Sequence, residues 1–325
     1  MRALALVSSG LDSILAVKVV QNQKVEVVGL RFIIPFHSSL KVRPVPSLDI
    51  GIRQIDISSE LLAILKKPRF GFGSQINPCI DCRILMLSKA KGLMSELGAD
   101  FVITGEVLGQ RPFSQHRRAL EVVAKESGLA GLLVRPLSAR LLPETIPEMN
   151  GWLNRQELFD FQGRSRKPQL ELARSMGIKE FLQPAGGCLL TEPEFARRIK
   201  DLKLHNGLSN LKEVELLKMG RHFRLSEKTK LIVGRDVKEN SLLEKMAEQG
   251  DYLIYPEADL PGPTALAKGC SDLRVITLAA RIVCRYCDLG SSKMAKVCYQ
   301  KVGDGFEEFV EVAPIEPEAI KTLRI

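Results

Sequence analysis

The stretch "SSGLDS" at residues 8–13 combines hydroxyl, glycine and carboxylate groups that suit phosphate chemistry. It follows the apolar run "ALALV" and opens a segment with apolar residues at helical spacing, so it joins a strand to a helix. Amides at a helix N-terminus attract anions, and Gly10 lets the backbone approach a phosphate closely. Asp12 can cap the helix or hold Mg²⁺. A plain strand-to-helix turn explains the same six residues equally well.

Three cysteines have a spacing that suits metal or sulfur chemistry. Cys79 and Cys82 form a Cys-x-x-Cys pair directly before a long helical pattern, and Cys188 follows a Gly-Gly turn. We expect the helix N-terminus to lower the thiol pKa of this pair. Three thiolates can hold a [4Fe-4S] cluster while one iron keeps an open position. A cluster-free persulfide relay through Cys82 and Cys188, and a zinc or purely structural role, are the alternatives.

A second Cys-x-x-Cys pair, Cys284 and Cys287, favours a structural role. It ends a segment with apolar residues at helical spacing, in which Cys284 occupies an apolar position. Cys270 and Cys298 could complete a zinc site, but their flanking residues lack the pattern of a zinc knuckle.

The elements that must position these groups alternate between strands and helices. This alternation predicts an α/β fold, in which a parallel sheet is covered by helices on both faces. Near residue 208 the elements become shorter, which predicts a boundary between an α/β domain over residues 1–208 and a smaller α+β domain over residues 209–325. The expected strands of the first domain cover residues 3–7, 25–34, 52–57, 99–105 and 131–137.

The charge of the chain favours an anionic partner such as RNA. The formal net charge is +9. Residues 1–209 hold 29 Lys and Arg against 20 Asp and Glu, whereas residues 210–325 hold 18 of each. The N-terminus does not read as a signal peptide, and no apolar run approaches the length of a membrane span. We therefore expect a cytoplasmic protein with reduced cysteines and no membrane partner.

"SSGLDS" resembles the Ser-Gly-Gly-x-Asp-Ser pyrophosphate loop of the PP-loop ATP pyrophosphatases, with Ser9 in place of the first glycine. "FVITGEVLGQRPFSQ", residues 101–115, is similar to a segment of the tRNA 4-thiouridine synthetase family that follows a parallel strand at the nucleotide site. The resemblance implies an adenine-nucleotide-hydrolase-like fold that binds ATP and Mg²⁺. The nucleotide contacts that it implies are Ser8, Ser9, Gly10, Asp12, Ser13, Phe32, Gly105, Gln110 and Lys167.

The cysteines extend this resemblance. "NPCIDC" is similar to the Asn-Pro-x-x-x-Cys segment of the 2-thiouridylase family, and Cys-x-x-Cys with one distant cysteine resembles the iron–sulfur-dependent tRNA thiolases. The resemblance implies that Cys82, Cys188 and Asp12 are catalytic and that Cys79, Cys82 and Cys188 ligate a [4Fe-4S] cluster. ATP adenylates the C2 or C4 oxygen of a tRNA pyrimidine, and sulfur from a cysteine desulfurase or free sulfide displaces AMP.

Two other functions compete with tRNA thiolation. One is a non-catalytic RNA-binding protein that carries a nucleotide-binding domain. The other is a PP-loop enzyme that transfers another nucleophile, such as nitrogen, although amine transfer needs no thiolate.

Two segments are candidates for RNA contact. "KLIVGRDVKENSLLEK" followed by "GDYLIYPEADLPGPTAL" resembles the RNA-binding domain of the NFACT family, with Tyr255 where a histidine is usual. That resemblance implies RNA contacts by Arg235, Lys238 and Asn240. Lys228 and Lys230 add basic charge to the same segment. In "GRSRKPQLELARSMGI", Arg164, Arg166 and Lys167 precede a helix, where they could contact phosphates of ATP or tRNA, or form a solvated loop.

Overall fold

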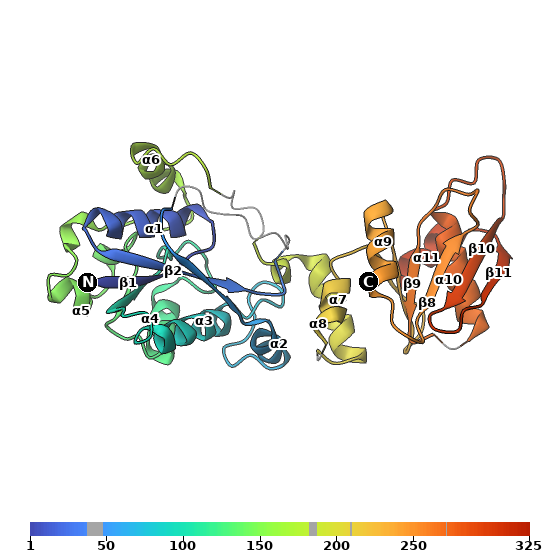
Figure 1. The fold of residues 1–325 in the computed structure, drawn as a ribbon, viewed down its shortest axis with the longest axis horizontal. Coiled ribbons are helices and arrows are strands. Elements are labelled where there is room, and N and C mark those ends of the chain that lie inside the picture. Colours follow the sequence, from blue (N-terminus) through green and yellow to red (C-terminus); the bar gives the residue numbers. More distant parts are fainter. Residues whose placement is uncertain (38–47, 182–186, 209, 271) are drawn as a thin grey trace. The chain divides into compact units, whose positions relative to one another are not determined.

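The computed structural model describes residues 1–37, 48–181, 187–208, 210–270 and 272–325. These residues form two compact units, residues 1–192 and residues 193–325 (Figure 1).

The first unit is built on a five-stranded parallel sheet with the strand order β3-β2-β1-β4-β5. The order reverses at the β1–β4 pair, because the chain builds outward on one side of β1 and then crosses to the other side. Ligands bind at such a switch point, beyond the C-terminal ends of the strands. The parallel sheet predicted from the sequence is confirmed. The strands are β1 (Arg2–Leu6), β2 (Glu26–Ile33), β3 (Ile52–Asp56), β4 (Phe101–Ile103) and β5 (Leu133–Val134).

Helices cover both faces of this sheet, as the alternating pattern predicts. On one face α1 (Leu11–Asn22) and α6 (Lys167–Ser175) pack over an apolar core that includes Ile14 and Phe101. On the other face α3 (Cys79–Leu93) and α4 (Arg117–Glu126) cover a second core that includes Leu87 (Figure 1). The remaining helices of the unit are α2 (Ser58–Lys66), the short α5 (Ile146–Met149) and single 3₁₀ turns at Ala139–Leu141, Arg155–Glu157 and Leu189–Thr191.

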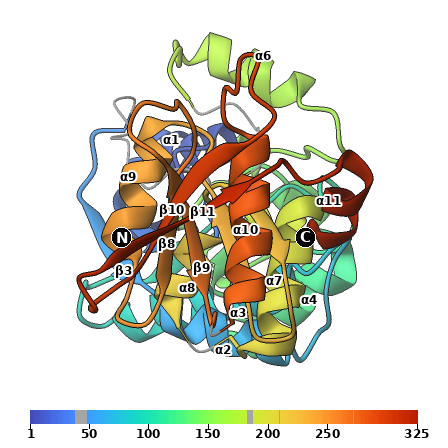
Figure 2. The same ribbon diagram turned by 90° about the vertical axis from the view of Figure 1, so that its right-hand side faces the viewer.

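The second unit is built on a six-stranded antiparallel sheet with the order β11-β10-β8-β9-β7-β6. On one face α10 (Leu273–Arg285) packs along β8, β10 and β11 (Figure 2), and its core also receives α11 (Pro317–Leu323). On the other face α8 (Leu211–Leu216) and α9 (Val237–Met246) bury Leu216 and Leu243 against Ile232 and Leu266. The strands are β6 (Arg221–Arg224), β7 (Lys230–Val233), β8 (Tyr252–Pro256), β9 (Ala265–Lys268), β10 (Ala295–Lys301) and β11 (Glu307–Val312).

The division between the units lies at Glu192/Pro193, whereas the sequence predicts a boundary at residue 208. The helix α7 (Pro193–His205) therefore belongs to the second unit. An ion cluster holds it there, because the Asp201 carboxylate accepts hydrogen bonds from Arg224 Nε at 2.9 Å and from Lys230 Nζ at 3.1 Å. The element pattern marks where the strands shorten, but it does not reveal to which core an amphipathic helix attaches. None of the described helices is long and apolar enough to cross a bilayer.

Candidate active site

The "SSGLDS" loop lies where the sequence predicts it, between the end of β1 and the start of α1. Gly10 is the N-cap residue of α1. The Ser13 hydroxyl donates to the Gly10 carbonyl at 2.8 Å and accepts from the Ser8 amide at 3.3 Å, so it shapes the loop. Within the described part of the chain the amides of Leu11 and Asp12 have no hydrogen-bond partner. The loop therefore presents amide donors to an anion at the switch point of the sheet.

Ser9 is the residue at which the loop departs from the pyrophosphate-loop pattern. Its backbone has a φ of 58°, in the left-handed region that favours glycine. A serine in this conformation costs about 1 kcal/mol relative to glycine. Its hydroxyl accepts a hydrogen bond from Arg31 Nη2 at 2.9 Å, so the substitution brings an arginine of β2 to the loop.

The segment after β4 packs directly on this loop. A Cβ atom on Gly105 would lie 2.4 Å from the Asp12 carbonyl oxygen and 2.6 Å from the Ser13 amide nitrogen, so only glycine fits there. Gln110 Nε2 donates to Asp12 Oδ2 at 3.1 Å. The two motifs that resemble nucleotide-binding segments therefore meet at Asp12, although more than ninety residues separate them in the sequence.

The second carboxylate oxygen of Asp12 is available for a cation. Oδ1 is buried and has no hydrogen-bond partner among the described residues, and Arg166 Nη2 lies 3.5 Å from it. An oxygen of this kind fits Mg²⁺, which prefers carboxylate ligands together with substrate phosphates. Arg166 directly precedes α6, which packs against α1, so this predicted RNA contact lies at the nucleotide loop.

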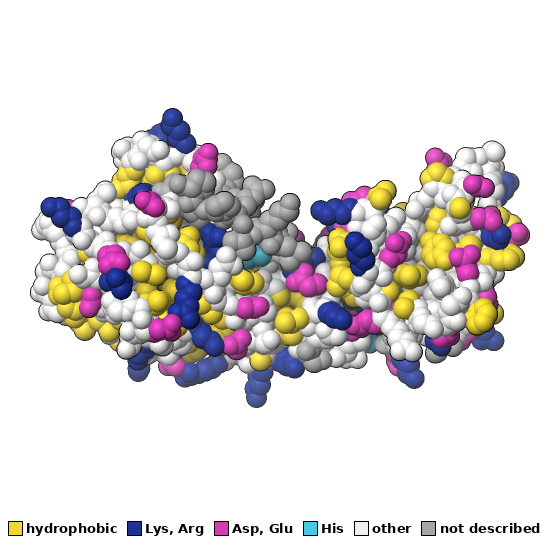
Figure 3. All heavy atoms as spheres, in the orientation of Figure 1, with side chains coloured by type: hydrophobic (Ala, Val, Ile, Leu, Met, Phe, Trp, Pro, Cys, Tyr) yellow, Lys and Arg dark blue, Asp and Glu magenta, His cyan; other side chains and the backbone are white. Residues whose placement is uncertain are grey.

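The other predicted contacts of this unit are spread over its surface and core. Arg164 and Lys167 are exposed, and Lys167 begins α6. Phe32 on β2 is partly buried and packs against the core on the α3 and α4 face. Figure 3 shows basic side chains along the side of the first unit on which α3 and α4 lie.

The chain brings Cys188 to the start of α3. Cys79 and Cys82 are the first and fourth residues of that helix. The segment after Cys188 is held by two backbone hydrogen bonds, from Ile76 to the Leu190 carbonyl at 3.4 Å and from Leu189 to the Phe36 carbonyl at 2.8 Å. The bond from Ile76 links the segment after Cys188 to the residues just before α3, and the bond from Leu189 links it to the residues that follow β2.

The electrostatics of the thiols are dominated by burial. Burial raises the pKa of Cys82 to about 12, and the Cys188 and Cys79 thiols add to the rise while Arg83 opposes it. Burial likewise raises the pKa of Cys188 to about 11, with a further contribution from Cys79. The expectation that the helix N-terminus lowers the thiol pKa is wrong for Cys82, because desolvation of the buried thiol outweighs the opposing charge of Arg83.

The donor set of this centre suits soft metals. Three thiolates match the ligands of an iron–sulfur cluster and also those of zinc. Across the described ranges of the chain, no three His, Cys, Asp or Glu side chains are arranged with the geometry of a metal site. The three thiols therefore lie in one region of the first unit, but the described residues do not form a metal site in this structure, and the donor set alone does not separate a cluster, a zinc ion and a persulfide relay.

The sequence analysis missed four charged residues at this site: Arg111, Glu106, Arg83 and Arg135. The charge of Arg111, the neighbour of Gln110, lowers the pKa of Cys188, which indicates that the segment after β4 approaches Cys188. Glu106 Oε1 lies 3.2 Å from Arg83 Nε on α3, and its Oε2 accepts from Arg135 Nε at 3.0 Å. Burial opposes ionisation of Glu106, but these arginines outweigh it and hold its pKa below the ordinary value. The sequence could have indicated Arg111 and Arg83, because they directly follow the predicted site residues Gln110 and Cys82.

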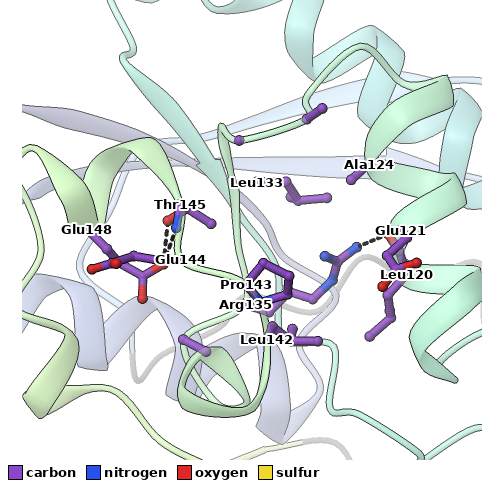
Figure 4. A pocket seen from close by; sticks show the side chains of 13 residues that line it. Leu120, Glu121, Ala124, Leu133, Arg135, Leu142, Pro143, Glu144, Thr145 and Glu148 are labelled. Carbon is purple, nitrogen blue, oxygen red and sulfur yellow. Dashed lines mark hydrogen bonds between the residues drawn. The ribbon is translucent and has the colours of Figure 1, made fainter.

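A separate pocket lies between α4 and the segment that leads to α5 (Figure 4). Glu121, Glu144 and Glu148 line it, and its one arginine, Arg135, already donates to Glu106 and to the Leu120 carbonyl. None of the predicted site residues is among its lining residues. Its acidic lining disfavours a nucleotide, so the switch point remains the candidate site.

In the second unit the predicted RNA contacts surround Gly234. The Arg235 guanidinium binds Glu239, with Nε 3.0 Å from both carboxylate oxygens, and its side chain is 50% exposed. A Cβ atom on Gly234 would lie 2.1 Å from Asn240 Oδ1, so the glycine leaves room for this buried, unpartnered amide oxygen. Lys238 is exposed.

Two further residues of this segment have structural roles. Lys230 is only 7% exposed and binds Asp201, so it does not contribute to a basic surface as its place in the sequence suggested. Tyr255, which stands where a histidine is usual, donates to Glu307 at 2.5 Å.

The remaining cysteines lie in or beside the core of the second unit. Cys284 is fully buried within α10, as its apolar position predicts. Cys270 and Cys298 are also buried, and Cys287 packs at the edge of the same core.

Comparisons with known proteins bear on the second unit. A solved structure, the C-terminal region of the fibronectin/fibrinogen-binding protein from Streptococcus suis, aligns with 76% of this chain and 100% of its own at 16% identity. Its TM-score of 0.29 is too low to support an argument. No curated protein matches the chain. Residues 220–324 match the family described as the NFACT protein RNA-binding domain, so this part of the chain is similar to that RNA-binding domain.

Proposed function

We propose that the chain is an ATP-dependent tRNA sulfurtransferase that replaces a pyrimidine carbonyl oxygen with sulfur. The observation that carries the proposal is the contact between Gly105 and the Asp12–Ser13 backbone, with Gln110 bound to Asp12. This contact joins the two segments that resemble the nucleotide site of tRNA thiolases, at the switch point of a parallel sheet. The RNA-binding domain at residues 220–324 supports RNA as the substrate.

The activation step uses the loop as a cradle for the leaving group. The pyrimidine oxygen attacks the α-phosphorus of ATP, a new P–O bond forms, and the bond to the β-phosphate oxygen breaks to release pyrophosphate. The free amides of Leu11 and Asp12 face the departing anion. Arg166 pairs with Asp12 Oδ1 at 3.5 Å and balances further negative charge. Because this oxygen accepts no hydrogen bond among the described residues, it would also serve as a ligand of Mg²⁺.

The sulfur step calls for a nucleophile next to the adenylated base. Cys79, Cys82 and Cys188 would hold a [4Fe-4S] cluster, which supplies an iron-bound sulfur when present. Arg111 acts on Cys188 while its neighbour Gln110 binds Asp12, so one short segment spans both halves of the site. The chain thereby orients the activated carbon toward the cysteines, which is the proximity that group transfer requires. A persulfide on Cys188 could use the same placement.

Nucleoside analysis tests this proposal. Anaerobically purified full-length chain is incubated with an unmodified tRNA transcript, ATP, Mg²⁺ and sulfide, and the digested tRNA is examined by mass spectrometry. We expect a thiopyrimidine with the wild-type chain and none with Cys82→Ser or Cys188→Ser, whereas Cys287→Ser retains activity. Close to four irons per chain supports the cluster. Activity without bound iron that appears only when a cysteine desulfurase and cysteine replace sulfide favours the relay, because the desulfurase transfers sulfur that is already at the persulfide level. No thiopyrimidine with either sulfur source and any metal loading contradicts the proposal.

A non-catalytic RNA-binding protein is the second candidate. It is favoured by the family match, which covers the RNA-binding domain alone, and by Ser9 in the loop. This candidate predicts tRNA binding with no consumption of ATP. Pyrophosphate measurement therefore separates the two functions.

A further inference from the structure

Arg31 reaches the "SSGLDS" loop from the neighbouring strand β2. The parallel register pairs Leu6 of β1 with Leu30 of β2, and the Val7 amide donates to the Leu30 carbonyl at 2.9 Å. Arg31 therefore stands beside the first residues of the loop that follows β1. Its Nη2 donates to the Ser9 hydroxyl at 2.9 Å. The contact lies at the C-terminal ends of the strands, which is the edge at which ligands bind in sheets of this kind.

The pleat of β2 directs the Arg31 side chain to the face of the sheet that α1 covers. Successive side chains of a strand point to opposite faces. Leu30 and Phe32, on either side of Arg31, pack in the core under α3 and α4, whereas Val27 packs in the core under α1. Arg31 shares the face of Val27, so its guanidinium lies on the side of the sheet where α1 begins and where the loop presents its amides.

Ser9 holds this arginine while its own backbone is in a conformation that glycine adopts more readily. Its φ is 58°, and the residue is only 7% exposed. The pyrophosphate loop that this segment resembles has glycine at the same position. Strained backbone occurs preferentially at ligand sites. Here the strained residue is the one whose hydroxyl binds Arg31, so the serine and the arginine act as a pair that the resembling pattern lacks.

The contact with a neutral hydroxyl leaves the charge of Arg31 in place. Burial lowers the pKa of Arg31, but a guanidinium keeps its proton at neutral pH. Of the nearby acids, Asp12 is engaged by Gln110 through Oδ2 and lies 3.5 Å from Arg166. Asp56, on the same face of β3, is exposed and accepts a hydrogen bond from a backbone amide at the start of α2. A cation held at a loop that presents amide donors suits an anionic ligand.

We propose that Arg31, held by Ser9, binds the β- and γ-phosphates of ATP, the part of the nucleotide that leaves as pyrophosphate. This inference rests on the ATP site of the proposed function and adds to it a phosphate contact that a loop with glycine at this position does not have. A guanidinium matches phosphate oxygens with its planar fork, and the bond to Ser9 uses one of its five N–H donors. The charge of Arg31 supplements the loop amides at the departing pyrophosphate.

Calorimetric titration of the full chain with ATP, pyrophosphate and AMP, each with Mg²⁺ and without tRNA, tests this contact. We expect Arg31→Gln to weaken the binding of ATP and of pyrophosphate by at least about tenfold, because charge-assisted hydrogen bonds are lost. The affinity for AMP stays unchanged, because AMP lacks these two phosphates. Arg31→Lys keeps the charge without the planar fork, so its loss is smaller. Arg53→Gln, at an exposed arginine of β3 that pairs with Glu96, is the matched control and leaves all three affinities unchanged.

Ser9→Gly supplies the second half of the test. It restores the glycine of the resembling pattern, relieves the strained backbone and removes the acceptor that holds Arg31. We expect it to weaken ATP binding when Arg31 is present and to have no further effect in the Arg31→Gln background, because the two residues act as a pair. This comparison and Arg31→Lys carry the test if Arg31→Gln does not fold.

The outcomes separate this inference from the proposed function. Wild-type affinity for ATP and pyrophosphate in Arg31→Gln overturns the phosphate contact even if tRNA is thiolated. An equal loss of affinity for ATP and AMP indicates that Arg31 only supports the loop, and it also overturns the contact. Binding of ATP that depends on Arg31 supports the contact even if the chain never releases pyrophosphate, in which case only the enzymatic proposal fails. A wild-type chain that binds neither ATP nor pyrophosphate contradicts both.

Discussion

Gly105 is the residue on which the proposed nucleotide site depends most directly. It has no room for a Cβ atom, because the Asp12 carbonyl and the Ser13 amide occupy that space. The resemblance of residues 101–115 to a nucleotide-site segment singled out Gly105, but the sequence did not reveal which atoms contact it. The atoms that occupy this space belong to the backbone, which cannot move aside as the end of a flexible side chain can. The contact therefore fixes the relative positions of the loops after β1 and β4.

Substitution of this glycine tests the contact. We expect Gly105→Ala to destabilise the first unit by about 1 to 3 kcal/mol, as overpacked sites do, and to abolish ATP turnover because the loop must shift. Gly92→Ala is the control, since Gly92 lies in α3 with open space around its Cα, and alanine there adds up to about 1 kcal/mol of helix stability. Chemical denaturation and pyrophosphate release report the two effects. Wild-type turnover in Gly105→Ala would show that the contact is dispensable.

The raised pKa of the buried thiols predicts their reactivity. Because the pKa of Cys82 is about 12 and that of Cys188 about 11, against an ordinary value of 9.0, both are protonated at pH 8. Alkylation requires the thiolate, so we expect iodoacetamide to modify both residues in the metal-free native chain at least about tenfold more slowly than in the denatured chain. The native rate rises with pH through this range. Peptide mass spectrometry measures both rates; equal rates in the native and denatured chains contradict the burial argument.

At the scale of elements, the sequence predicted the parallel sheet well because apolar segments alternate with helical patterns. The segments at residues 25–34 and 52–57 became β2 and β3 almost residue for residue, although β3 (IRQID) alternates apolar and polar side chains. β5 is only two residues long, although an apolar run suggested seven, because the chain turns away after Val134. The attachment of α7 was not predictable, since it depends on Asp201 meeting Arg224 and Lys230 across distant segments.

The anchoring of α7 gives a prediction with a definite pH dependence. Burial opposes ionisation of Asp201, but Arg224 and Lys230 outweigh it and hold its pKa below 3.8. A depressed pKa stabilises the fold above the unfolded value and loses this effect as pH falls through the folded value. We expect Asp201→Asn to cost about 2 to 3 kcal/mol at pH 7, because it leaves two cations uncompensated, and the difference from wild type to shrink below about pH 4.

A surface ion pair provides the comparison. Asp304 pairs with Lys301 at 2.9 Å, but both side chains are at least 42% exposed, so Asp304→Asn should change stability by less than about 1 kcal/mol. Denaturant titrations of the full chain at several pH values measure both variants. A pH-independent effect of Asp201→Asn would refute the ion-cluster explanation for the position of α7.

At the scale of the whole chain, we propose a nucleotide site in the first unit, and residues 220–324 of the second unit are similar to an RNA-binding domain. The sequence supplied the motifs of both, and the structure added the contacts that connect motifs within each unit: Gly105 to Asp12, Glu106 to Arg83, and Asp201 to β6 and β7. Composition could not reveal that Lys230 is buried or that Arg235 forms an ion pair with Glu239, because burial and ion pairing depend on which segments the fold brings together. Charge in the sequence is therefore an unreliable guide to which residues contact RNA.

Release of pyrophosphate from ATP on addition of an unmodified tRNA transcript is the decisive test of the proposed enzyme. We expect release that requires both ATP and tRNA in the wild-type chain, falling by at least about a hundredfold in Asp12→Ala, because the loop loses the oxygen proposed to hold Mg²⁺ and its link to Gln110. Asp160→Ala, which removes an exposed carboxylate paired with Arg140, should release pyrophosphate at the wild-type rate. No tRNA-dependent release by the wild-type chain, or equal release by Asp12→Ala, would contradict the account.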